Sequence, residues 1–334
     1  MKPIKIAQIG TGHDHASSIW GELNKYTECF DCIGLCEPVE EYKNRPFENL
    51  SYKDAKLWTL DELLNNPDLE AVAIEAGKEY STYYAQLFAE RGVHIYLDKP
   101  GTADLASYEK LVRTCEKNGV VFHLGYMYRY NPLICRCFEM AREGKFGEIY
   151  SVEAQMSVRH NPEKRQWLSR YKGGMMYYLG CHLIDLVYTL QGEPDEVLPM
   201  NTCVGTDGVT AEDFGFAILK YPHGVSMIKT NGAEYNGYHR RQLVISGTRG
   251  TAELRPLEYY VSGGIRTTGL ITLEDFKPDS WKNSAQYVCS TPAGRYDAML
   301  HGFAEMVRGE RKNPYTPDYE IGLMRLLLKC CGVQ

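Results

Sequence analysis

The feature that most restricts the fold is a regular alternation of short apolar runs and helical segments over the first 125 residues. Runs with the length of buried strands lie at Ile4–Ile9, Cys32–Cys36, Ala71–Glu75, Val93–Leu97 and Val120–Gly125. Helical segments between them end near Lys25 and cover roughly Tyr80–Arg91 and Asp104–Asn118. Strands that alternate with helices of this length form βαβ units, whose strands pair in parallel. This part of the chain is therefore predicted to be an α/β domain with a parallel sheet.

The pattern changes after residue 125. Helices are predicted from Pro132 to Glu143 and over Gly174–Leu190, with a long strand at Ile149–Val158 between them. Several strands then follow without intervening helices, among them Phe214–Tyr221, Val225–Thr230 and Gln242–Ser246. Adjacent strands of this kind pair antiparallel. Two helices close the chain, near Ala298–Arg308 and Asp318–Cys330. We expect two domains, 1–125 and 126–334, the second an α+β domain with a large, mostly antiparallel open sheet.

Charge and cysteine content exclude several classes of protein. The 37 basic and 43 acidic residues give a net charge of −6, which argues against nucleic-acid binding because that function needs a basic face. No apolar run approaches the roughly 20 residues of a membrane helix, and no signal-peptide pattern opens the sequence. The 11 cysteines show no paired Cys/His spacing. We expect a cytoplasmic protein with reduced core thiols and no membrane or nucleic-acid partner.

A glycine turn directly follows the first predicted strand. Gly10 and Gly12 fit a G-x-G turn, where a backbone without side chains can approach a pyrophosphate and the next helix offers free N–H groups. His15 replaces the third glycine of the usual pattern. Glu37 ends the second predicted strand, where a carboxylate accepts hydrogen bonds from a ribose 2′-hydroxyl and repels a 2′-phosphate. The turn predicts an NAD site, with NADP less favoured; a purely structural turn is the alternative.

The residues of the turn itself are also candidates for cofactor contact. Thr11, His13, Asp14 and His15 are expected to line the dinucleotide. The histidines and the aspartate could instead be metal ligands. Three consecutive residues on a tight turn do not easily converge on one ion, so no metal site is predicted.

Taken together, the sequence resembles the Gfo/Idh/MocA oxidoreductases, a family that includes glucose-fructose oxidoreductase and inositol dehydrogenase. The resemblance covers nearly the whole chain and rests on five ordered motifs, which are the Gly10–His15 turn, Arg91–Pro100 with its Asp98-Lys99-Pro100 end, Gly125–Pro132, Gly173-Gly174 with Gly180–Asp185, and Ile245–Gly250. It implies a Rossmann-like domain followed by a domain whose sheet often forms a subunit interface, and hence a homodimer or homotetramer. The implied reaction is hydride transfer between a nicotinamide and a carbon of a sugar, cyclitol or related polyol.

The resemblance also implies catalytic residues. Lys99 ends a predicted strand on the cofactor side, where an ammonium can hydrogen-bond the reacting oxygen and stabilise alkoxide character. His182 lies in a predicted helix and can exchange the hydroxyl proton, because histidine titrates near neutrality. Asp185 shares the face of His182, so it could orient the imidazole, contact substrate or make a structural contact.

The sequence departs from the family pattern at three places. Tyr178 stands four residues before His182, where many relatives carry aspartate, and it is interpreted as an acid, a substrate contact or a core residue. The stretch Glu75–Ser81 replaces a Thr-Pro-Asn-like segment, so only its backbone, at Glu75 and Ala76, is expected to border the cofactor. Asp98 replaces the usual glutamate and keeps its charge.

Candidate substrate contacts are assigned by position along the same motifs. They fall in the third motif, in the segment before the helix of His182, in that helix, and in a loop at a sheet end. These residues are Met127, Tyr128, Arg129, Arg165, Trp167, Asp185, Tyr235 and Tyr238.

Three functions are compatible with these residues. The favoured one is an NAD-dependent dehydrogenase or reductase of a sugar-like alcohol. The second is an enzyme that holds NAD tightly and oxidises a sugar transiently, so that glycoside cleavage or epimerisation follows at the acidified neighbouring carbon. The third is a non-catalytic nucleotide sensor. Lys99 and His182 argue against the sensor, because binding alone does not require that pair.

Overall fold

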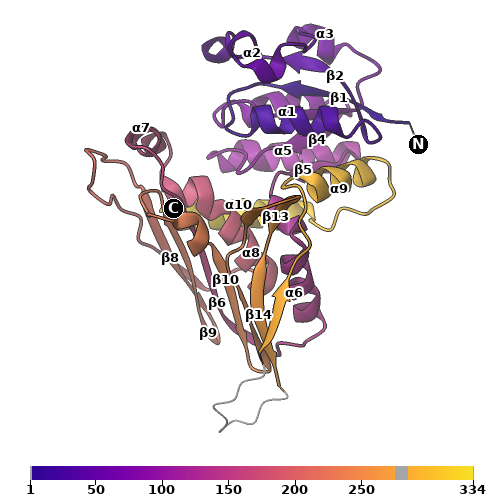
Figure 1. Ribbon diagram of the computed structural model, residues 1–334. Helices are drawn as coiled ribbons and strands as arrows, with labels where there is room; N and C mark the ends of the chain where they lie inside the picture. The colour runs from indigo at the N-terminus through magenta and orange to yellow at the C-terminus, as the bar shows by residue number, and fades with distance from the viewer. Residues whose placement is uncertain (1, 275–284, 334) are drawn as a thin grey trace. The chain divides into compact units, whose positions relative to one another are not determined.

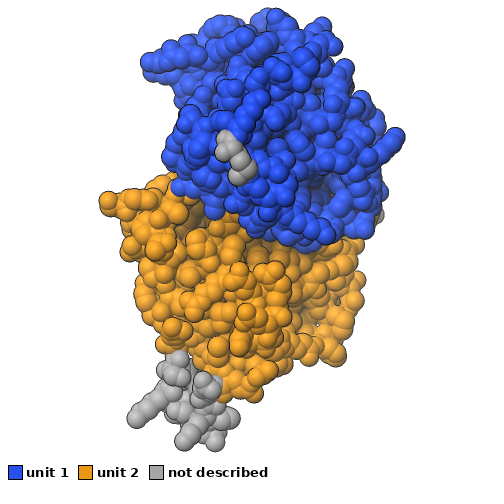
Figure 2. Space-filling view, turned by 90° about the vertical axis from the view of Figure 1, so that its right-hand side faces the viewer, with its two compact units in different colours: residues 1–126, 296–321 blue, residues 127–295, 322–334 orange. Residues whose placement is uncertain are grey.

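The computed structural model describes residues 2–274 and 285–333. The chain forms two compact units, which Figure 2 distinguishes by colour. Unit 1 contains Met1–Tyr126 and Tyr296–Ile321, and unit 2 contains Met127–Arg295 and Gly322–Gln334. Among the described residues, no helix has the length and apolarity needed to cross a membrane.

Unit 1 is built on a parallel sheet of five strands in the order β2-β1-β3-β4-β5 (Figure 1). The strands are β1 (Ile4–Ile9), β2 (Phe30–Cys36), β3 (Ala71–Ile74), β4 (His94–Leu97) and β5 (Phe122–Leu124). The helices before residue 126 are α1 (Ala16–Lys25), α2 (Arg45–Glu48), α3 (Leu60–Leu64), α4 (Ser81–Ala89) and α5 (Leu105–Asn118). The βαβ prediction is confirmed. Because all five strands run the same way, the residues that follow β1, β2, β3 and β4 lie at one edge of the sheet.

One later segment also belongs to unit 1. The sequence assigned all of 126–334 to the second domain, but Tyr296–Ile321, which contains α9 (Asp297–Val307), groups with the first unit. This grouping is explained by the packing of Phe303 in α9 against aromatic residues of the parallel sheet. The centroid of its ring lies 6.4 Å from that of Phe30, 5.9 Å from that of Tyr96 and 5.6 Å from that of His123. Such long-range packing leaves no local pattern in the sequence.

Unit 2 contains an eight-stranded sheet in the order β15-β14-β11-β10-β6-β9-β8-β7. Only β6 and β9 pair in parallel among its described strands, which confirms a mostly antiparallel sheet. The strands are β6 (Ile149–Ser157), β7 (Glu196–Pro199), β8 (Phe214–Tyr221), β9 (Gly224–Asn231), β10 (Gln242–Gly247), β11 (Gly250–Leu254), β14 (Thr268–Leu273) and β15 (Gln286–Cys289). A separate hairpin pairs β12 (Tyr259–Val261) with β13 (Gly264–Arg266).

The helices of unit 2 are α6 (Pro132–Arg142), α7 (Pro162–Trp167), α8 (Cys181–Gln191) and, from Gly322 onward, α10 (Pro317–Cys330). The helix α8 packs on β6 and β9, as Figure 1 also shows, and α6 contacts β11. On β8 the side chains of Ala217 and Leu219 are buried, whereas Phe216 and Ile218 on the opposite face are half-buried. The second face of β8 therefore presents partly exposed apolar side chains.

Candidate active site

The turn after β1 requires its glycines. Gly10 has a φ of +88°, and a Cβ built there would lie 2.5 Å from Cα of Ala76. A Cβ on Gly12 would lie 2.6 Å from the backbone nitrogen of Gly77. The His13 N–H also donates to the Glu75 carbonyl oxygen over 2.9 Å. The turn is thus packed directly against the segment that follows β3.

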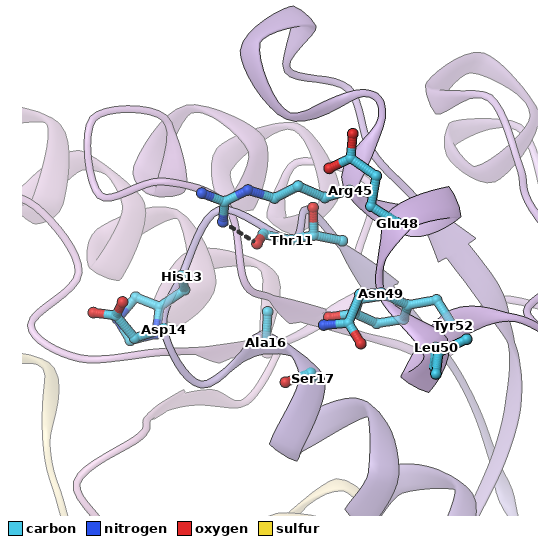
Figure 3. A pocket seen from close by; sticks show the side chains of 10 residues that line it. All are labelled: Thr11, His13, Asp14, Ala16, Ser17, Arg45, Glu48, Asn49, Leu50 and Tyr52. Atoms are coloured by element: carbon cyan, nitrogen blue, oxygen red, sulfur yellow. Dashed lines mark hydrogen bonds between the residues drawn. The ribbon is translucent and has the colours of Figure 1, made fainter.

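A pocket of about 640 Å³ opens beside this turn (Figure 3). Ala16 and Ser17, in the first turn of α1, lie on one side of it, and that first turn has no acidic residue. A helix N-terminus favours a bound phosphate, because its free N–H groups and dipole are positive. The other lining residues are Thr11, His13, Asp14, Arg45, Glu48, Asn49, Leu50 and Tyr52. The closely packed glycines, the pocket and the helix N-terminus together fit a dinucleotide.

Glu37 secures the turn from the end of β2. One carboxylate oxygen accepts hydrogen bonds from the Thr11 N–H and hydroxyl, both over 2.5 Å, and the other accepts from the Val39 N–H over 3.0 Å. Arg45 donates to the Thr11 carbonyl oxygen over 2.8 Å (Figure 3). Its guanidinium group also lies over the ring of Tyr42. Sequence reasoning missed Arg45, although a loop after the second strand is where a 2′-phosphate ligand would lie.

Four ionisable side chains are buried together at the same edge of the sheet. Asp98 follows β4, and one of its oxygens lies 2.9 Å from Nδ1 of His13 and 3.0 Å from Nδ1 of the half-buried His15. Glu75 follows β3, is fully buried, and places Oε2 3.7 Å from Nδ1 of His13. Lys78 is also buried nearby, in the stretch where the sequence departs from the family pattern.

Burial and mutual charge shift the pKa values of this cluster. Burial, and then the neighbouring Asp98, raise the pKa of Glu75 well above its ordinary value. Burial alone would also raise the pKa of Asp98, but His13 and His15 outweigh it and hold that pKa well below the usual range. Burial lowers the pKa of His13 to about 4, against the opposing effect of Asp98. The two carboxyl groups therefore favour opposite protonation states.

Both backbone polar groups of Lys99 make hydrogen bonds to side chains. Its N–H donates to Oδ1 of Asp98 over 2.7 Å, and its carbonyl oxygen accepts a hydrogen bond from Nε2 of His13 over 3.0 Å. The side chain is almost completely buried, and the following bond to Pro100 is cis. The nucleotide-binding turn and the β4 end that carries Lys99 are thus directly connected.

In unit 2, Tyr178 and His182 lie on one continuous helical segment. Tyr178 belongs to a π-helical turn, η5 (Met176–Gly180), and His182 to α8, which follows at once. The Tyr178 ring packs edge-on against Trp167 and His160, whereas the His182 ring lies 5.2 Å from that of Tyr128. The sequence predicted one helix here and missed the π-helical turn, a feature frequent at functional sites.

Several predicted substrate contacts are engaged within unit 2. Arg129 makes a buried bidentate ion pair with Asp185, with N–O distances of 2.7 to 3.0 Å. Of the roles that the sequence left open for Asp185, this ion pair favours the structural contact. Arg165 is fully buried and donates to Asp213 over 2.9 Å while also pairing with Asp207. These arginines fix the local fold.

The remaining predicted contacts differ in their accessibility. Tyr235 and Tyr238 are exposed, and guanidinium groups of Arg159 and Arg241 lie over their rings. Trp167 is half-buried, and the ammonium of Lys164, which the sequence did not single out, lies 3.7 Å from its ring centre. The remaining two, Met127 and Tyr128, are buried in the short helix η3 (Met127–Tyr130).

Comparison with known proteins agrees with this architecture. Residues 4–126 match the model of the oxidoreductase family with an NAD-binding Rossmann fold. Residues 136–253 match the GFO/IDH/MocA C-terminal domain. The chain belongs to the Gfo/Idh/MocA oxidoreductase family. It is an NAD(P)-binding oxidoreductase.

Individual relatives are distant. The chain is 24% identical over 286 residues to the uncharacterized oxidoreductase YdgJ of Escherichia coli, covering 79% of each chain. It is 24% identical to 2,7-anhydro-N-acetylneuraminate hydratase of Mediterraneibacter gnavus, over 76% of this chain and 68% of the relative. It is also 24% identical to the NADP-dependent scyllo-inositol 2-dehydrogenase IolW of Bacillus subtilis, over 53% and 51%. The WlbA dehydrogenase of Bordetella pertussis, solved with NADH and UDP-GlcNAcA, shares the fold with a TM-score of 0.77 at 18% identity, covering 99% of this chain and 97% of that one.

Proposed function

We propose that this oxidoreductase transfers hydride between NAD and a secondary alcohol of a sugar, cyclitol or related polyol. The observation that carries the proposal is the double hydrogen bonding of the Lys99 backbone to Asp98 and His13. Those bonds tie a buried ammonium to the turn that fits the dinucleotide. The named relatives include one dehydrogenase of a cyclitol, which supports the substrate class.

The proposed mechanism divides the chemistry between cofactor and protein. When bound, the nicotinamide supplies the hydride acceptor or donor. Lys99 hydrogen-bonds the reacting oxygen and stabilises the negative charge that develops on it during oxidation. His182 accepts the hydroxyl proton in oxidation and returns it in reduction. Tyr178 contacts the substrate or donates a proton from its phenol.

NAD is proposed over NADP because of the Glu37 carboxylate. Glu37 lies at the end of β2 and is hydrogen-bonded to Thr11 of the turn. A fixed negative charge at this position repels a 2′-phosphate. Arg45, which donates a hydrogen bond to the same turn, carries a positive charge that would attract a 2′-phosphate. The relative IolW is also named as NADP-dependent. We therefore expect a preference rather than an exclusion.

The experiment that tests the reaction follows NADH absorbance during incubation with NAD and a panel of sugars and cyclitols. A signal that depends on one substrate and disappears in Lys99→Ala supports the proposal. Lys110→Ala is the matched control, because Lys110 is exposed on α5. Absence of any signal across the panel, in a protein that binds NADH, contradicts net dehydrogenation.

A second reaction of the same residues is favoured by one finding. A relative over most of this chain is named a hydratase, and Tyr178 replaces the aspartate common in the family. We propose as the alternative that a sugar hydroxyl is oxidised transiently, which acidifies the adjacent C–H, and that the carbonyl is reduced again after elimination or addition. NAD that remains bound through purification, with substrate conversion and no net NADH, would distinguish this reaction.

We also propose that the protein self-associates through the open face of the unit 2 sheet. Phe216 and Ile218 on β8 and Met227 on β9 are half-buried there. Partly exposed apolar residues gathered on one sheet face are typical of subunit interfaces, and Lys229 lies among them, opposite Phe216. A cytoplasmic location is a further part of the proposal.

A further inference from the structure

Four side chains with metal-binding atoms converge at the sheet edge of unit 1. His13 and His15 come from the nucleotide-binding turn, Asp98 from the end of β4 and Glu75 from the end of β3. The nearest ligand atoms of His13, His15 and Asp98 all lie within 4.8 Å of one another. The sequence argument against a metal considered only the consecutive residues of the turn. The fold adds Asp98, which lies 83 residues beyond His15 in the sequence.

The hydrogen-bond partners of His13 favour a positive charge between its Nδ1 and Asp98. Nε2 lies 3.0 Å from the carbonyl oxygen of Lys99 and must carry a proton to make that hydrogen bond. In the neutral ring, Nδ1 then presents a lone pair. This lone pair accepts from the His15 N–H over 3.2 Å, yet it also lies 2.9 Å from a carboxylate oxygen of Asp98. Two electron pairs at this distance repel each other unless a positive charge is shared between them.

Glu75 supplies an independent observation. Its side chain is 0% exposed, and neither carboxylate oxygen has a hydrogen-bond partner within the described part of the chain. Oε2 lies 3.7 Å from Nδ1 of His13, so the carboxyl group reaches the same cluster. A buried carboxyl group without hydrogen bonds is costly to ionise unless it pairs with a cation or coordinates a metal, and Lys78 and Lys99 already interact electrostatically with Glu75.

The donor set suits a divalent transition metal, and the ligand separations would have to change by only a few tenths of an ångström to bind one. Zinc is bound tetrahedrally by imidazole nitrogen and carboxylate oxygen at about 2.0–2.2 Å, which places neighbouring ligand atoms roughly 3.3–3.6 Å apart. The separations from His13 Nδ1 are 2.9 Å to Asp98 and 3.7 Å to Glu75, and His15 lies 3.0 Å from Asp98. We propose that His13, His15 and Asp98 bind one Zn²⁺-class divalent cation, with the buried carboxyl group of Glu75 beside His13.

Charge predicts how this ion depends on the dinucleotide. Lys78 and Lys99 are buried and interact electrostatically with Glu75. With Glu75 ionised beside the bound cation, two ammonium and two carboxylate groups cancel, so the occupied site carries the two net positive charges of the cation. The pyrophosphate of a dinucleotide at the adjoining turn offsets them. Metal and dinucleotide should therefore bind cooperatively; this part of the inference rests on the proposed function, whereas the metal site does not.

The chain contains a second cluster that any test must separate from this one. Glu28, Cys29 and His301 also offer three ligand atoms within 4.8 Å of one another, but Glu28 is exposed and the set includes a thiol. Co²⁺ distinguishes the two clusters, because a thiolate ligand adds a near-ultraviolet charge-transfer band and a nitrogen–oxygen tetrahedral site shows only its visible d–d bands. His301→Gln is the matched control variant.

The experiment titrates the full-length, chelator-treated protein with Co²⁺ and follows visible absorption. We expect one equivalent to bind without a thiolate band, Zn²⁺ to displace it, and His301→Gln to retain it. His15→Gln should weaken Co²⁺ binding at least about 100-fold, since even loss of an outer partner costs roughly 10–100-fold. Asp98→Asn should behave similarly, and circular dichroism verifies that both variants are folded.

Three outcomes would overturn the site: no Co²⁺ binding, a thiolate band that disappears in His301→Gln, or unchanged binding in folded His15→Gln. In each case a proton shared among His13, Asp98 and Glu75 would be the remaining explanation. Repeating the titration with NAD present should tighten Co²⁺ binding. Unchanged affinity, with NADH binding verified separately by fluorescence, would reject the cooperativity while leaving the site intact.

Discussion

His182 is the residue to which the proton transfer is assigned. It is buried in α8, with its ring against Tyr128. A positioned general base contributes about 10²–10⁴-fold to the rate, so His182→Asn should lower kcat by that order and remove the acidic limb of the pH–rate profile. His239→Asn is the control, because His239 is exposed, in the short helix η6 (Gly237–Arg240). A variant with unchanged kcat and pH profile would assign the proton to another group.

Selection between NAD and NADP is a second property of single residues. The substitution Glu37→Gln removes the negative charge but keeps a hydrogen-bond acceptor for Thr11. It should raise the ratio of kcat/KM with NADP to kcat/KM with NAD by roughly ten-fold, which corresponds to about 1.4 kcal/mol. Arg45→Gln should shift the ratio toward NAD, because a guanidinium stabilises a 2′-phosphate. Equal ratios in all three proteins would mean that neither side chain faces the adenosine ribose.

The sequence located individual residues where their position depends on local context. The glycines of the turn, Glu37 at the end of β2 and Lys99 after β4 all follow strands, and strand ends can be located from apolar runs. The convergence of His13 with Asp98, and the ion pair of Arg129 with Asp185, depend on contacts between distant segments. No local pattern encodes them, and Asp185 was accordingly left with several possible roles.

At the scale of elements, the turn between β1 and α1 can be tested with two glycines. Gly12→Ala would force a Cβ against Gly77 and Tyr42, so it should weaken NADH binding strongly and destabilise the fold. Gly21→Ala is the matched control within α1, where a Cβ meets no atom within 4 Å. It should stabilise the protein by about 0.5–1 kcal/mol, since glycine is unfavourable inside a helix. Fluorescence titration with NADH and urea unfolding measure the two effects.

The β4–β5 pair predicts a pH dependence of stability. His94 begins β4, and its Nδ1 accepts a hydrogen bond from the Val121 N–H over 2.9 Å. Burial lowers the pKa of His94 below the ordinary 6.5, so the folded state prefers the neutral ring. The stabilisation is complete above the unfolded pKa and is lost as the pH falls below it toward the folded value.

The measurement is the free energy of unfolding in urea at about pH 7.5 and about pH 5.5, for wild type and His94→Asn. The wild type should lose more stability than the variant on acidification, because the variant has no titrating ring at this position. An equal loss in the two proteins would place the effect elsewhere.

The elements themselves were predictable to different degrees. The parallel strands and the long strand β6 follow from apolar runs and from the spacing between them. The π-helical turn η5 was not predictable, because its residues have the pattern of an ordinary helix; it begins soon after Gly173 and Gly174, whose φ values are +84° and +43°. The position of α9 depends on the aromatic contacts of Phe303, which connect it to three strands.

At the scale of the whole molecule, self-association is the main expectation. Ile218 and Met227 are directly paired across β8 and β9 on the open sheet face, and Ile218→Asp should therefore convert an oligomer to monomer. Tyr260→Ser, an exposed position on the β12–β13 hairpin, serves as the control. Sedimentation velocity over a range of concentrations measures the outcome. A wild-type protein that sediments as monomer throughout would reject this interface.

The division of unit 1 between two stretches of chain has a consequence for biosynthesis. Tyr126 and Tyr296 bound the gap, and the hydrophobic surface that Phe303 covers belongs to strands made much earlier. At a translation rate of about 5–20 residues per second, roughly 10–30 s pass before α9 leaves the ribosome. During this interval the apolar surface of unit 1 that Phe303 later covers stays exposed to solvent. A molecular chaperone that binds such surfaces would find its substrate during this interval.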